Sequence, residues 1–255
     1  MHNRSGACTA GCRSFVARLC VAMAGVGSLV VTQQALAAYE IITVANGGTI
    51  EGTVTLSGAT PSEPPLKVTK NQDYCGQTIP DPAYSVDGHG GLANVIVYLK
   101  DISKGKAAPA EPLSLVNEKC MFSPRVQGAM VGGQVKISSE DTVLHNTHPQ
   151  NSDTNATIFN VALPFKGFSV TKPLPSMPMM IKVKCDAHEW MHAWIMELDH
   201  PYYTTSGTDG HFIIKDVPPG TYTLAVWHEV AGEKSVPVVV TAGQTVKTQI
   251  ALAAK

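Results

Sequence analysis

Residues 208–224 read TDGHFIIKDVPPGTYTL, and this stretch decides the fold class. An Asp-Gly pair opens one short apolar run, and a Pro-Pro-Gly turn leads into a second run. Proline presets φ and glycine supplies the positive φ that tight turns require, so both mark points where the chain reverses. Two such runs about one turn predict a β-hairpin.

Short apolar, β-branched runs between glycine, proline and Asp-Gly pairs recur along the whole chain. They occupy residues 49–56, 93–99, 134–138, 157–163, 179–185, 193–198, 211–214, 221–228, 235–241 and 245–252. Helical periodicity is weak throughout, so the sequence predicts an all-β protein built of sandwiches.

The composition limits the class of protein. The chain has 255 residues, of which 44% are hydrophobic and 15% charged, which is too apolar for a disordered chain. Its formal net charge of −1 gives no support for a nucleic-acid partner. No stretch approaches the roughly 20 apolar residues that a membrane span requires, so we expect none.

Residues 1–37 have the layout of a secretory signal peptide. Arg4, Arg13 and Arg18 form a basic start without acids, and an uncharged apolar run over residues 19–31 follows. Ala35-Leu36-Ala37 supplies the cleavage pattern, so the sequence predicts a periplasmic or secreted protein cut after Ala37. The mature chain then carries 16 basic and 20 acidic residues, a formal charge of −4.

Removal of this leader leaves an odd number of cysteines, Cys75, Cys120 and Cys185. In an oxidising compartment an odd count means that one thiol is unpaired, intermolecular or a ligand. Cys185 opens the stretch CDAHEWM, residues 185–191, and His145 stands forty residues upstream. A thiolate, two imidazoles and a thioether are the ligand set of a type 1 copper site.

The Cys-x2-His-x2-Met loop, together with His145-Asn146, resembles the copper site of cupredoxins, in loop length that of amicyanin and more distantly that of plastocyanin. The resemblance covers about residues 119–200 and implies a β-sandwich that transfers one electron to a protein partner. It also implies that Asn146 braces the two ligand loops. The copper ligands that it implies are His145, Cys185, His188 and Met191.

The stretches 47–56 and 208–252 resemble the carboxypeptidase regulatory-like, prealbumin-type sandwich, which is often classed with carbohydrate-binding-like folds. The resemblance implies that residues 38–104 and 201–255 form this sandwich around a cupredoxin-like insert at 105–200. The pairing is similar to bacterial proteins labelled methylamine utilization protein. With Cys185 at the metal, we expect Cys75 and Cys120 to form a disulfide.

Three more residues crowd the motif and leave the fourth ligand open. Glu189 or His192 in place of Met191 would give a more tetragonal, red copper centre. His148 is a further possible ligand, although an exposed polar role is the simpler interpretation for His148 and His192. Zinc is the chief rival metal, although zinc sites seldom use methionine.

The sequence favours a periplasmic electron carrier over an enzyme, because no nucleophile set, phosphate-binding loop or carboxylate pair stands out. Two alternatives use the same chain differently. One is a copper storage, delivery or sensing protein, and the other is a carbohydrate- or surface-binding module with a structural metal.

Overall fold

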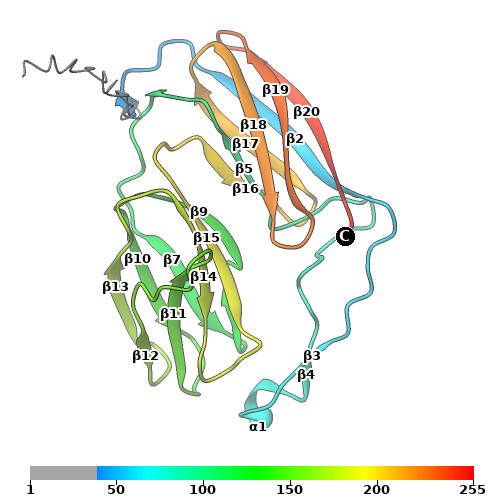
Figure 1. Ribbon diagram of the computed structural model, residues 1–255, viewed down its shortest axis with the longest axis vertical. Helices are drawn as coiled ribbons and strands as arrows, with labels where there is room; N and C mark the ends of the chain where they lie inside the picture. The colour runs from blue at the N-terminus through cyan, green and yellow to red at the C-terminus, as the bar shows by residue number, and fades with distance from the viewer. Residues whose placement is uncertain (1–38) are drawn as a thin grey trace, which may run out of the picture. The chain divides into compact units, whose positions relative to one another are not determined.

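The computed structural model describes residues 39–255, so the predicted leader at 1–37 lies outside the described residues. The described chain is almost entirely strands and loops (Figure 1), with one helix of four residues, α1 (Gln72–Cys75). The prediction of an all-β protein is therefore confirmed. Within residues 39–255, no helix has the length and hydropathy that crossing a membrane requires.

The first sandwich is built from both ends of the described chain. Its four-stranded sheet has the order β16 (Tyr203–Thr205), β5 (Ile96–Leu99), β18 (Gly220–His228) and β19 (Gly232–Val240). Its three-stranded sheet has the order β17 (His211–Val217), β2 (Gly48–Ser57) and β20 (Thr245–Ala253). Alternate residues of these strands point into one core, which includes Ile50, Val97, Phe212, Leu224 and Ile250.

The predicted hairpin at 208–224 is wrong in one respect. The two strands about the Pro-Pro-Gly turn are β17 and β18, but they lie in different sheets and do not pair with each other. β17 pairs with β2, whereas β18 pairs with β5 and β19. The turn carries the chain from one layer of the sandwich to the other, because both strands must bury an apolar face in the same core.

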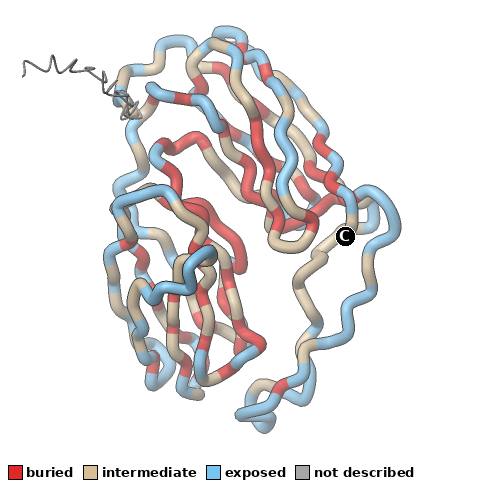
Figure 2. The backbone as a smooth tube through the Cα atoms, in the orientation of Figure 1, coloured by how far each residue is buried: buried red, intermediate tan, exposed pale blue. Residues whose placement is uncertain are grey.

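The second sandwich is formed by consecutive strands between residues 113 and 198. One sheet has the order β13 (Ser169–Pro173), β10 (Gln134–Ser139), β7 (Leu113–Glu118) and β8 (Met121–Ser123). The other has the order β12 (Val161–Leu163), β11 (His145–Asn151), β14 (Met179–Lys184), β15 (His192–Leu198) and β9 (Val126–Met130). Buried residues alternate with less buried ones along β10 and β11, as expected for sheets with one face in a core, whereas β9 and the end of β15 are buried on both faces (Figure 2).

Two short strand pairs lie outside the sandwiches. β1 (Glu40–Ile41) pairs in parallel with β6 (Lys104–Gly105). β3 (Leu66–Lys67) pairs with β4 (Thr78–Ile79), and α1 lies between them, so residues 66–79 form one excursion of the chain. The sequence predicts that this 66–79 segment belongs to the first sandwich, but Val68 is fully buried in the core of the second.

A buried polar network connects residues of the two sandwiches. Arg125 and Glu229 form an ion pair of 2.6 Å with side chains 6% and 5% exposed, and the Trp194 indole N–H donates to Glu229. Burial alone would raise the pKa of Glu229, but hydrogen bonds from His192, Arg125 and Trp194 hold it down at about 2. Glu229 is therefore charged, and loss of Arg125 would leave it buried without a counterion.

Candidate metal site

One tight loop between β14 and β15 carries three of the four expected ligands. β14 ends at Lys184, Cys185 follows directly, and the register of the two strands closes at Lys184 opposite His192. The Met191 N–H donates to the His188 carbonyl at 2.9 Å, and the Cys185 N–H donates to the Met191 carbonyl. These bonds fix the loop on the ends of two paired strands.

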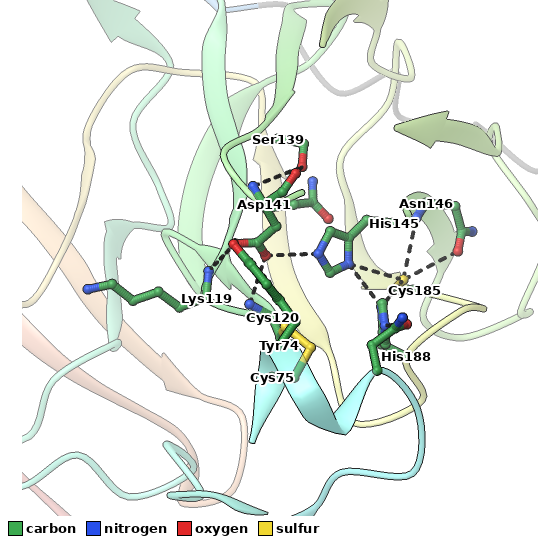
Figure 3. Close-up of polar contacts among 12 residues, drawn as sticks. Tyr74, Cys75, Lys119, Cys120, Ser139, Asp141, His145, Asn146, Cys185 and His188 are labelled. Atoms are coloured by element: carbon green, nitrogen blue, oxygen red, sulfur yellow. Dashed lines mark hydrogen bonds and ion pairs between the residues drawn. A yellow bond between two sulfur atoms is a disulfide. The ribbon is translucent and has the colours of Figure 1, made fainter. Parts of the chain in front are cut away.

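The fourth expected ligand comes from the neighbouring strand. His145 begins β11, which pairs with β14 in the same sheet. The Nδ1 atoms of His145 and His188 lie 3.0 Å apart, and Cys185 Sγ lies 4.0 Å from the first and 3.7 Å from the second (Figure 3). All three residues are buried, and the separations fit one ion bound about 2.0–2.3 Å from each atom.

Met191 and the three alternative ligands lie in different surroundings. Met191 is 1% exposed and belongs to the same core cluster as Cys185. Glu189 is exposed, His148 bonds Asp186 and Thr157, and His192 bonds Arg125. None of these three joins the group of close ligand atoms found within residues 39–255.

Burial sets the protonation of the ligand group. Burial first, and then the nearby His145 and Lys70, lower the pKa of His188 to about 4. Burial also lowers the pKa of His145, although the hydrogen bond that His145 donates to Asp141 opposes this effect. Burial raises the pKa of the Cys185 thiol, so an ion that binds here meets two neutral imidazoles and displaces one thiol proton.

Asp141 bonds the remote nitrogen of His145 and is not among the site residues that the sequence predicts. Its Oδ2 lies 2.8 Å from His145 Nε2 and accepts the Cys120 N–H, while Oδ1 accepts the N–H of Lys119 and the Tyr74 hydroxyl (Figure 3). Lys119 and Cys120 both have positive φ, a turn that aims successive N–H groups at one anion. The sequence feature that could have pointed to Asp141 is the position of an acidic residue four positions before His145, the first predicted ligand.

His188 is held by a residue far away in the sequence. Its Nε2 lies 2.9 Å from Oδ1 of Asn71, 117 positions earlier, and its ring packs 4.9 Å from that of Trp190. His188 is 0% exposed as a result. No motif in the sequence points to Asn71.

Asn146 connects the two ligand segments, as the resemblance implies. Its Oδ1 accepts the N–H groups of Asp186 and Ala187 at 2.6 and 3.1 Å, and its own N–H donates to Cys185 Sγ at 3.4 Å. Its Nδ2 donates to Asp186 and to Asn160. One side chain thus holds the start of the ligand loop against β11.

Replacement of Asn146 with alanine is expected to lower the free energy of unfolding of the metal-free protein by about 1–3 kcal/mol, because two loop N–H groups lose their acceptor. Denaturant unfolding measures the change. Asn160→Ala is the matched control, since Asn160 touches the same cluster without bonding the loop backbone. Equal losses in both variants would contradict the bracing role.

Comparison with family models finds a match to a family described as polysaccharide lyase family 4, domain II, over residues 183–248. The matched stretch runs from β14 through the start of β20 and so takes in strands of both sandwiches. Comparison with curated protein sequences finds no match.

Comparison with solved structures finds cupredoxins. A reduced, Cu(I) form of an amicyanin variant is 13% identical, with a TM-score of 0.31, and the match covers 36% of this chain and 86% of that one. A purple cupredoxin from Nitrosopumilus maritimus is 22% identical, with a TM-score of 0.29, and the match covers 34% of this chain and 99% of that one. Both matches thus concern about a third of this chain.

Proposed function

We propose that this protein binds one type 1 copper ion and carries one electron. The observation that supports this most strongly is the buried triangle of His145 Nδ1, His188 Nδ1 and Cys185 Sγ, with Met191 on the same loop. Two imidazoles and a thiolate in a trigonal arrangement, with a weak thioether beside them, suit copper rather than a four-coordinate structural zinc site. The proposed ligands are His145, Cys185, His188 and Met191.

The surrounding residues would hold this ligand set nearly still. A bound copper ion would supply the Cu(II)/Cu(I) couple. Asp141 and Asn71 hold the remote nitrogens of the two imidazoles, and Asn146 holds the Cys185 loop. Ligands fixed on paired strands and excluded from water change position little between oxidation states, which favours rapid electron transfer. Export through the 1–37 leader and a protein redox partner belong to the same proposal.

The visible spectrum after addition of Cu(II) tests the proposal. We expect an intense blue or green thiolate band and a reversible one-electron couple, and Cys185→Ser should abolish the band. His148→Ala is the control, because His148 lies next to the site but bonds Asp186 and Thr157 instead. A colourless protein that holds only Cu(I) would contradict electron transfer and favour storage or delivery. A band lost in His192→Ala but kept in Met191→Ala would contradict Met191 as the fourth ligand.

A further inference from the structure

The 66–79 segment covers the candidate metal site at the remote edge of His188. Asn71 precedes α1 with φ of 54°, in the left-handed region, and its side-chain oxygen lies against His188 Nε2. Trp190 packs on the same imidazole from the ligand loop. Together these contacts leave no part of His188 in contact with solvent.

The same segment also reaches the second imidazole, through Asp141. The Tyr74 hydroxyl donates to Asp141 Oδ1 at 3.1 Å, and Asp141 Oδ2 bonds His145 Nε2 (Figure 3). Residues three positions apart on one short turn therefore contact the remote side of both histidines, one directly and one through a carboxylate. A segment that packed here only to fill a surface would not need two polar contacts aimed at the ligands.

A covalent bond fastens the segment beside the site. Cys75, at the end of α1, forms a disulfide with Cys120, in agreement with the predicted pair. Cys120 donates its N–H to Asp141 and accepts the Trp190 indole N–H at its carbonyl. The fastening point thus lies within the shell of residues that supports both histidines.

We propose that the 66–79 segment is a cap that closes the metal site, with Asn71 and Tyr74 as positioning residues and the Cys75–Cys120 disulfide as its fastening. The inference rests on the proposed function only in taking the enclosed site as a metal site. An ion reaches or leaves the ligands when the cap opens, and a redox partner meets the outer side of the cap rather than a bare histidine edge. That outer side carries the exposed residues Lys70, Gln72 and Asp73.

The reactivity of Cys185 in the metal-free protein tests the cap without reference to copper. Cys185 is 2% exposed and is the free cysteine among residues 39–255, so a thiol reagent must wait for an opening. The full chain is treated with iodoacetamide, and the rate of modification of the peptide that contains Cys185 is followed by mass spectrometry. We expect Asn71→Gly, which keeps the left-handed backbone, to raise this rate at least fivefold.

Asn155→Gly is the matched control, since Asn155 is also a left-handed asparagine but lies exposed in the loop after β11. A Cys75→Ser, Cys120→Ser double variant should raise the rate at least tenfold, and circular dichroism checks that it folds. Should it unfold, Tyr74→Phe replaces it, because this variant keeps the disulfide and loses only the bond to Asp141. The proposal would be overturned if the rate of Cys185 modification in Asn71→Gly lay within twofold of the rate in the Asn155→Gly control.

Release of Cu(I) to a chelator is the second readout, and we expect it to accelerate at least tenfold in the same variants. The two proposals fail separately. If the protein binds no copper but Cys185 is modified faster in Asn71→Gly than in wild type, the cap proposal stands and the electron-carrier proposal is refuted. If the copper-loaded protein is blue and has a reversible redox couple, but Cys185 reacts at the same rate in wild type and Asn71→Gly, the electron-carrier proposal stands and the cap proposal is refuted.

Discussion

Replacement of Asp141 with alanine is expected to lower the free energy of unfolding of the metal-free protein by about 3–5 kcal/mol. Asp141 is 2% exposed, and its carboxylate accepts the backbone N–H groups of Lys119 and Cys120 and bonds His145 Nε2. Each buried donor left without an acceptor costs about 1–3 kcal/mol. Of the four donors that lose this acceptor, those of Cys120 and His145 are buried, and those of Lys119 and Tyr74 are partly exposed and add less. Denaturant unfolding at neutral pH gives the value.

The same variant should bind copper about 10–100-fold more weakly, because the partner that orients a ligand histidine is lost. Asp141→Asn keeps one carbonyl oxygen and should show a smaller loss in both measurements. Asp153→Ala, an exposed acid in the loop after β11, is the control for general loss of negative charge. Wild-type copper affinity in Asp141→Ala would rule out a supporting role for this carboxylate.

Glu197 should make the protein less stable as the pH rises. It lies on β15 with 1% exposure, and neither carboxylate oxygen has a hydrogen-bond partner. Burial raises its pKa from 4.5 to about 8, so the folded state holds the proton over a range in which the unfolded chain releases it. The stability is thus full below about pH 4.5, falls as the pH rises towards 8, and then levels off. A rise of the pKa from 4.5 to about 8 corresponds to a total loss on the order of 5 kcal/mol.

Glu197→Met should remove this loss, so the difference in unfolding free energy between variant and wild type should grow from pH 5 to pH 9. Taking the difference also cancels the contribution of the buried histidines His200 and His228 to the pH dependence. Their lowered pKa values reduce stability as the pH falls. Glu111→Gln, an exposed carboxylate, is the control. A constant difference across this range would show that Glu197 is solvated or paired in solution.

Apolar patterning predicts the strands whose inner face is apolar. The predicted runs at 134–138 and 245–252 coincide with β10 and β20 to within a residue. Apolar patterning does not predict the extent of β11, because its sequence HNTHPQN is polar and contains proline. Its inward positions hold His145 and Thr147 rather than aliphatic residues. Because a residue of the candidate site takes one of these positions, the alternating apolar pattern that indicates a strand is absent from β11. Apolar patterning also does not predict the edge strand β13, because this strand has no buried face that would require apolar residues.

Three of the four predicted ligands lie close together in the sequence, whereas the residues that hold the ligands in place do not. Cys185, His188 and Met191 stand on one loop, so their spacing predicts their proximity. Asn71 meets His188 across 117 positions, and only the fold of the 66–79 segment onto the second core brings them together. Periodicity places a residue on a face of its own strand but says nothing about which distant loop covers it.

The pairing of β2 sets an order of events during synthesis. β2 is the central strand of its sheet, with β17 on one side and β20, in parallel register from Thr49 opposite Thr245, on the other. Both neighbours are made after the whole of the second sandwich, whose strands end at Leu198. The nascent chain therefore completes the second sandwich first and carries β2 as a strand with two unpaired edges for about 150 residues. Such edges invite pairing with other chains. Closure of the first sandwich waits for its last strand, so the contacts of highest sequence separation form last and set the folding rate.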